Sequence, residues 1–155
     1  MAEPPAPGDP AGDGISITRI FAAPRERVWR EWTEPARFAD WFGGDHGDVP
    51  VSTVSMDVRV GGQWRATMLV GTKEIRWKGE YQEVDEPRRL VFTISDQPGD
   101  DEYELVIVDL ADLGDGRTEM AFQQRGRMSP EQYTAAGHGW STFFDRLEEH
   151  LLDTA

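Results

Sequence analysis

The sequence predicts an α+β domain in which a curved, seven-stranded antiparallel sheet wraps around one long C-terminal helix. Three observations predict this fold class. Short apolar segments recur between turn residues from position 51 to position 127, two short helical patterns follow the first strand, and an apolar stripe at helical spacing closes the chain. Strands in such a series form antiparallel sheets that bury one face, so the last helix is expected to cover that face.

Length and composition indicate a single domain. The chain has 155 residues, of which 38% are apolar and 29% charged, and it contains no cysteine. Residues 1–14 are rich in proline, glycine and acidic residues and are expected to form a disordered tail ahead of one domain over residues 15–152. We find neither a secretory signal nor the ~20 consecutive apolar residues of a spanning helix, and therefore predict a cytoplasmic protein without membrane insertion. The formal net charge of −13 opposes binding to nucleic acid.

A strand and two short helices are expected first. The segment from Ile15 to Phe21 alternates weakly between apolar and polar residues, as a strand does. Pro24 suits the first turn of a helix, because its missing N–H would have no partner there. Pro35 begins a second short helix, which ends at Gly43.

Charged residues on the first helix alternate in sign. Arg25, Arg27 and Arg30 are interspersed with Glu26 and Glu31. We interpret this pattern as a solvated helix face and not as a basic strip, so it gives no support to DNA binding.

Six further strands follow at regular spacing, with turn residues between them. The clearest alternation is that of residues 74–84, where Ile75, Trp77 and Tyr81 share one face. Gly61-Gly62 is expected to form a tight hairpin turn. The six predicted strands cover residues 51–59, 63–70, 74–84, 89–95, 103–111 and 118–127.

The C-terminal helix has the clearest start signal in the chain. Ser129 and Gln132 form the pattern of a capping box, and Pro130 occupies the first helical position. Gly137 and Gly139 each cost roughly 1 kcal/mol relative to alanine in a helix interior. We interpret these glycines as residues that permit either a close approach of the helix to the sheet or a bend of the helix beside Trp140.

Several motifs, taken in order, resemble one superfamily. They are ISITRIF, APRERVWREWTEP, ADWFGG, MDVRVGGQWR, KGEYQEVDEPRRLVFT, DGRTEMAF and GHGWSTFFDRLEEHL. The chain resembles the helix-grip superfamily of START lipid-transfer domains and polyketide cyclases (SRPBCC), and within it the branch similar to the C-terminal domain of the activator of heat-shock protein 90 ATPase. The resemblance covers residues 15–152 and implies a cavity between the sheet and the last helix. It transfers no catalytic residue, because this branch shares a fold signature and not an active-site motif.

Aromatic and thioether side chains are available to line the implied cavity. The chain has six tryptophans and five methionines, which provide flat and adaptable apolar surface suited to a hydrophobic ligand. The expected lining residues are Trp32, Trp41, Met56, Trp64, Met68, Trp77, Tyr81, Phe92, Met120, Phe122, Trp140 and Phe143. The Tyr81 hydroxyl and several indole N–H groups could orient a polar end of the ligand, and His138 and Arg65 are further polar candidates. The alternative interpretation is that the aromatic residues fill the core.

No catalytic, metal or cofactor site is predicted. Asp57 and Arg59 could clamp an anionic group, but we favour a structural ion pair. His46 lies beside two aspartates in a loop whose spacing matches no metal site, so we favour a solvated loop. The acidic run from residue 96 to residue 104 lacks the pattern of a calcium loop.

Three functions remain open. The first choice is a protein that binds or sequesters a small hydrophobic ligand. The second is an enzyme of the polyketide cyclase or aromatase kind, which would require at least two ionisable groups facing inward, and Tyr81, Arg65 and His138 are the candidates. The third is a co-chaperone or other protein-binding module, a possibility that the strongly acidic surface disfavours.

Overall fold

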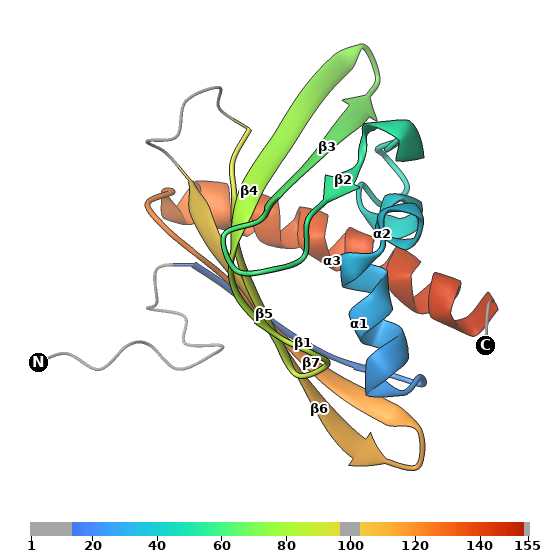
Figure 1. Cartoon of the computed structure of the whole chain (residues 1–155). Helices are drawn as coiled ribbons and strands as arrows, with labels where there is room; N and C mark the ends of the chain where they lie inside the picture. Colours follow the sequence, from blue (N-terminus) through green and yellow to red (C-terminus); the bar gives the residue numbers. More distant parts are fainter. Residues whose placement is uncertain (1–13, 97–102, 154–155) are drawn as a thin grey trace, which may run out of the picture.

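The computed structural model describes residues 14–96 and 103–153 and confirms the predicted α+β architecture (Figure 1). One seven-stranded antiparallel sheet has the strand order β1-β7-β6-β5-β4-β3-β2. Its strands are β1 (Gly14–Phe21), β2 (Ser55–Met56), β3 (Gln63–Val70), β4 (Lys73–Asp85), β5 (Arg89–Ile94), β6 (Glu104–Gly114) and β7 (Arg117–Arg125).

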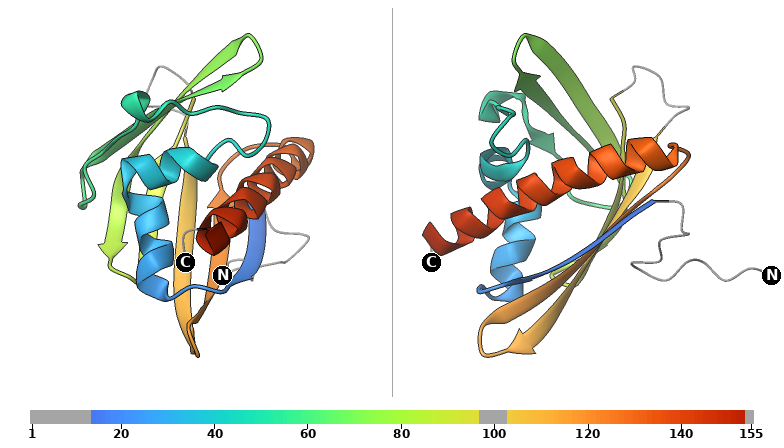
Figure 2. Two further views of the ribbon diagram at one scale, coloured as in Figure 1. Left: turned by 90° about the vertical axis from the view of Figure 1, so that its right-hand side faces the viewer. Right: turned by 180° about the vertical axis from the view of Figure 1, so that it is seen from behind.

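The helices lie on one side of this sheet. They are α1 (Arg25–Thr33), α2 (Pro35–Trp41) and α3 (Pro130–Asp153), with a short 3-10 helix, η1 (Val51–Thr53), before β2. The sheet curves around α3, and α1 and α2 lie beside the C-terminal half of that helix (Figure 2). No described helix is both long and apolar enough to cross a membrane.

The predicted capping box of α3 is confirmed. The Gln132 backbone N–H donates to Ser129 Oγ at 3.1 Å, and the Ser129 N–H donates to Gln132 Oε1 at 2.8 Å. Two backbone donors at the helix start are thereby satisfied by side chains. The position where α3 begins is thus encoded locally.

The two glycines inside α3 differ in their distance from the sheet. A Cβ atom added at Gly137 would lie 3.8 Å from Ile15 Cγ2, an ordinary van der Waals distance, and one added at Gly139 would meet nothing within 4 Å. The close-approach interpretation is therefore wrong for Gly139. The helix runs without interruption through both residues.

The prediction of a strand over residues 51–59 is wrong in most of its length. Only Ser55 and Met56 pair with β3, and η1 precedes them. The turn predicted at Gly61-Gly62 is present, because the Gly62 N–H donates to the Arg59 carbonyl at 2.8 Å in the segment that joins the paired strands β2 and β3. The same loop also bonds to β4, because the Gly61 N–H donates to the Tyr81 carbonyl and the Tyr81 N–H donates to the Gly62 carbonyl, each at 2.9 Å.

Other strand boundaries differ by a few residues. β6 continues to Gly114, because Asp115 and Gly116 have positive φ values of 49° and 78° and form a two-residue turn before β7. The predicted tail lies outside the described residues apart from Gly14, which begins β1. Most of the acidic run from residue 96 to residue 104 also lies outside them.

Candidate functional site

The residues predicted to line a cavity gather between the sheet and α3. Nine of the twelve are at most 5% exposed: Trp32, Trp41, Trp64, Met68, Tyr81, Phe92, Met120, Phe122 and Trp140. Met56, Trp77 and Phe143 are half-buried and pack against the others. The structure therefore brings the whole predicted set together, and its role in ligand binding stays a prediction.

The aromatic side chains that contact one another between the sheet and the helices are called the ring cluster below. Trp32 lies at its centre. Its ring centroid lies 4.7 Å from that of Trp41, and the two rings meet edge to face at 72°. Five further rings lie between 6.1 and 6.4 Å from Trp32: Phe38, Phe92, Phe122, Trp140 and Phe144. Contacts of this kind are favourable beyond the area that they bury.

Strand alternation and helical spacing direct these side chains inward. Along β3, Trp64 and Met68 are buried, whereas Arg65 between them is exposed on the opposite face of the sheet. Along α3, Trp140 and Phe144 lie four residues apart on the side that faces the sheet. The local pattern of the sequence therefore accounts for the cluster.

The cluster has a half-buried rim, which consists of Met56, Trp77 and Phe143. Met56 pairs with Trp64 across β2 and β3, and the Phe42 ring lies 6.2 Å from Trp77 and 5.4 Å from Phe143. Figure 1 shows that the β3–β4 hairpin, which carries Trp77, extends beyond α3. Apolar surface is thus continuous from the rim to the buried rings.

Three indole N–H groups of the cluster have acceptors within the protein. Trp41 donates to the Glu31 backbone carbonyl at 3.0 Å, and Trp64 donates to the Thr93 carbonyl at 3.0 Å. Trp140 donates to the Gln124 side-chain carbonyl at 2.7 Å. These bonds fix the orientation of three large rings.

Trp32 and Trp77 differ from these three tryptophans. Their Nε1 atoms are buried and have no hydrogen-bond partner in the described part of the chain. Buried N–H groups without an acceptor are uncommon in folded proteins, because removing such a group from water is unfavourable. Two donors are therefore available to an acceptor within this region.

Gly79 makes the Trp64 hydrogen bond possible. A Cβ atom at this position would lie 1.7 Å from the Thr93 carbonyl oxygen and 2.3 Å from Trp64 Nε1. Any side chain at position 79 would occupy the path of the bond. A glycine in the interior of a strand is the sequence signal for such a close approach.

Tyr81 is the inward-facing ionisable residue among the three predicted polar candidates. It is 2% exposed, and burial, with a smaller contribution from the negative charge of Asp57, raises its pKa well above the ordinary value of about 10. The phenol therefore stays protonated at neutral pH. It can take part in hydrogen bonds there but is not a base.

The other two polar candidates lie away from the ring cluster. His138 is exposed on α3. Arg65 lines a hollow of about 920 Å³ on the outer face of the sheet, together with Lys78, Glu80 and Tyr103, and Trp64 and Trp77 of the ring cluster also border this hollow. The structure brings neither residue to the interior.

The remaining polar residues have structural or solvated positions. Arg59 Nε lies 3.0 and 2.9 Å from the two carboxylate oxygens of Asp57, which confirms the predicted ion pair. His46 is exposed, as expected of a solvated loop. Within residues 14–96 and 103–153, no group of three histidine, aspartate or glutamate residues is placed to hold a metal ion.

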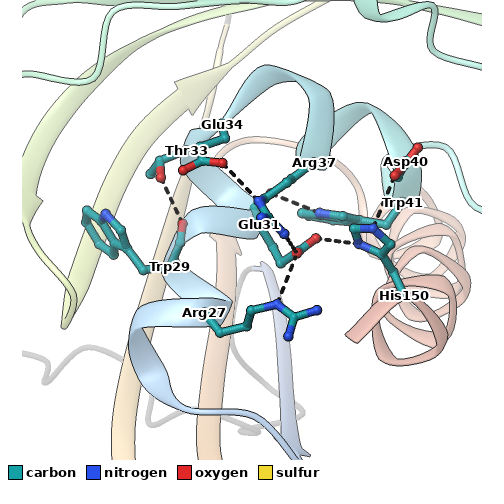
Figure 3. Close-up of polar contacts among 9 residues, drawn as sticks. All are labelled: Arg27, Trp29, Glu31, Thr33, Glu34, Arg37, Asp40, Trp41 and His150. Carbon is teal, nitrogen blue, oxygen red and sulfur yellow. Dashed lines mark hydrogen bonds and ion pairs between the residues drawn. The ribbon is translucent and has the colours of Figure 1, made fainter. Parts of the chain in front are cut away.

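A buried ionic cluster joins the three α-helices, and the sequence analysis missed it (Figure 3). Glu31 is 0% exposed, and its Oε1 atom lies 2.7 Å from Nδ1 of His150. Its Oε2 atom lies 3.4 Å from Arg37 Nη1 and 4.0 Å from Arg27 Nε. The second ring nitrogen of His150 lies 3.1 Å from Asp40 Oδ2.

The interpretation of the first helix as having a solvated charged face is therefore wrong for Glu31. The face that carries Glu31 is covered by α2 and by the end of α3 (Figure 3). The signal was its spacing, because Glu31 lies three residues after the buried Val28 and next to the buried Trp32. Its backbone carbonyl accepts the Trp41 indole N–H and so connects the ionic cluster to the ring cluster.

The chain matches known proteins at the level of a family and of several solved structures. Residues 22–152 match the model of the family described as Activator of Hsp90 ATPase homolog 1-like protein. Comparison with curated proteins finds no match.

Similar folds occur in bacterial proteins of known structure. A protein from Chromobacterium violaceum is 25% identical with a TM-score of 0.77, over 90% of this chain and 96% of that one. A protein from Nitrosomonas europaea is 24% identical with a TM-score of 0.76, over 92% and 96% of the two chains. The AHSA1 protein from Silicibacter pomeroyi is 20% identical with a TM-score of 0.80, over 92% and 99%. The fold, the ordered motifs and the family match agree, and the chain belongs to the Activator of Hsp90 ATPase homolog 1-like family.

Proposed function

We propose that the protein binds a small hydrophobic molecule between the sheet and α3. The observation that supports this most is the half-buried rim of Met56, Trp77 and Phe143, which leads without a polar break to the ring cluster. Apolar and aromatic linings with a few polar groups are typical of small-molecule sites. The family fold, which is that of ligand-binding and cyclase-like domains in general, is consistent with this proposal.

A cluster of rings is suited to accept a flat ligand. Most ring pairs around the rim meet edge to face or at a tilt, and each such contact is worth about 0.5–1.5 kcal/mol beyond area burial. A flat molecule that enters would replace ring–ring contacts with ligand–ring contacts of the same kind. Met56 and Met68 have flexible unbranched side chains that can adjust to its outline.

The positions of the polar groups favour binding without turnover over catalysis. Proton transfer in the interior would need an acid or base placed there, with a pKa near the working pH. Tyr81 is held protonated by burial, and His138 and Arg65 lie outside the ring cluster. We therefore propose a carrier or sequestering role.

The test is a titration of the full chain with the neutral hydrophobic dye Nile red, followed by its fluorescence. Phe143→Ala should weaken binding about tenfold, because Phe143 belongs to the rim and does not line the outer hollow. Tyr103→Ala is the matched control, since Tyr103 is 58% exposed and lines the outer hollow. Loss of affinity in Tyr103→Ala alone would place the dye on the outer face and contradict the proposal.

Native mass spectrometry identifies the natural ligand. The protein purified from its own host should show, under gentle conditions, an added mass that denaturing conditions remove. If the wild-type chain shows neither this added mass nor saturable dye binding, the binding proposal fails.

A further inference from the structure

We infer that the ligand of the proposed site carries a neutral hydrogen-bond acceptor, such as a ketone or quinone carbonyl, on a flat apolar body. The inference rests on the proposed function, because it describes the chemistry of the molecule bound between the sheet and α3. It follows from the unequal hydrogen bonding of the five tryptophans in the ring cluster.

The two unpaired donors occupy different depths of one continuous set of rings. Trp32 is 2% exposed, whereas Trp77 is half-buried at the rim. Ring contacts connect them through Trp140 and Phe42, with centroid distances of 6.2, 5.8 and 6.2 Å along the path. A ligand that inserts from the rim along these rings would reach the Trp77 donor first and the Trp32 donor deeper in the cluster.

Three carbonyl acceptors that border the ring cluster are already used. The carbonyl groups of Glu31, Thr93 and Gln124 accept the indole protons of Trp41, Trp64 and Trp140. The indole N–H groups of Trp32 and Trp77 are left without an acceptor in the described part of the chain, which is an imbalance between these donors and their acceptors. A ligand that supplies an acceptor corrects this imbalance, whereas a ligand that supplies a further donor does not.

An indole N–H that points at a neighbouring aromatic ring still gains more from a carbonyl oxygen as its acceptor. The Trp32 and Trp41 rings lie 4.7 Å apart at 72°, a geometry in which an N–H can approach a ring face. Such contacts are weaker than an N–H to carbonyl bond. The formal charge of −13 opposes a carboxylate or phosphate ligand, so a neutral acceptor fits best.

Two probes of nearly equal shape test the inference. 2-Acetylnaphthalene and 2-ethylnaphthalene share the same ring system, and the first carries a carbonyl oxygen. We expect the acetyl compound to bind the full chain about tenfold more tightly, as measured by titration of tryptophan fluorescence. Trp77→Phe, which removes the indole N–H at the rim, should reduce that ratio if the rim donor is used.

The indole proton signals of the ¹⁵N-labelled wild-type chain give a readout that does not depend on any variant. The acetyl compound should shift the signal of Trp32 or Trp77 downfield. The signals of Trp41, Trp64 and Trp140 are internal controls, because these donors already have acceptors. The ethyl compound should produce no downfield shift at Trp32 or Trp77.

The possible failures are distinguishable. Equal affinities for both probes with no selective downfield shift would overturn the inference and leave the proposed binding function intact. Failure of the wild-type chain to bind either probe or Nile red would overturn both.

Discussion

Glu31 and His150 lie 119 positions apart in the chain, and Glu31 Oε1 lies 2.7 Å from Nδ1 of His150. This contact ties α1 to the last turns of α3. Because the opposite ring nitrogen lies 3.1 Å from Asp40 Oδ2, α2 is joined to the same imidazole. The helix that covers the ring cluster is thus fixed at its start by the capping box of Ser129 and Gln132 and near its end by the contacts of His150 with Glu31 and Asp40.

Replacing Glu31 should strongly destabilise the fold. In Glu31→Ala, the guanidinium groups of Arg27 and Arg37 lose the buried carboxylate that faces them, and His150 loses a hydrogen-bond partner. Breaking a buried ion pair by removing one partner typically costs about 3–5 kcal/mol, because the other charge stays buried without compensation. We expect a loss in this range in the free energy of unfolding, as measured by urea denaturation.

Glu34→Ala is the matched control for that variant. Glu34 is an exposed residue that lies 2.9 Å from the same Arg37 side chain that contacts Glu31. Exposed pairs contribute about 0–1 kcal/mol, so this variant should unfold close to the wild type. Similar losses in Glu31→Ala and Glu34→Ala would show that burial of the ionic cluster does not matter.

Tyr81 should make the fold sensitive to alkaline pH. Its pKa is raised in the folded state, chiefly by burial, and is about 10 in the unfolded state. The associated stability is fully present below pH 10 and is lost as the pH rises above 10, because the unfolded chain then releases a proton that the folded chain keeps. The free energy of unfolding should fall by up to about 1.4 kcal/mol per pH unit from this group.

Tyr81→Phe isolates this contribution from the other groups that titrate at high pH. Urea unfolding of the two proteins should show the same pH dependence between pH 7 and pH 9. Above pH 10, the variant should lose stability less steeply than the wild type. Parallel curves through pH 11 would mean that the phenol is not desolvated in the folded state.

Sequence patterns predicted the fold because its elements are encoded locally. Alternation along residues 74–84, the capping box at Ser129 and the apolar stripe of the last helix each depend on neighbours a few residues away. The strand predicted over residues 51–59 forms only at Ser55 and Met56, and the loop after it takes hydrogen-bond partners from Tyr81 on another strand. Such distant partners leave no periodic signal.

The ring cluster was predicted in its membership and not in its polar detail, and its role in ligand binding stays a prediction. Aromatic content and strand alternation identified the ring cluster, since large apolar side chains on inward positions are buried together. The ionic cluster was missed because Glu31 is adjacent to charged residues in sequence, whereas its partner His150 comes from the far end of the chain. Which indole donors lack acceptors depends on individual distances that no sequence pattern encodes.

Two glycine-to-alanine variants should have effects of opposite sign. In Gly79→Ala the new methyl group would overlap the Thr93 carbonyl and the Trp64 indole nitrogen, so the strand must shift and the hydrogen bond between them is lost. We expect a loss of about 3 kcal/mol in the free energy of unfolding, from overpacking together with a broken buried hydrogen bond.

In Gly139→Ala the methyl group enters open space on α3, so the gain in helix propensity of about 1 kcal/mol should appear in full. Thermal and urea unfolding of both variants measure the two effects on the same chain. Stabilisation by Gly79→Ala would show that β4 and β5 do not approach as closely as the Trp64 to Thr93 bond requires. A loss of stability in Gly139→Ala would show that this helical position is sterically crowded.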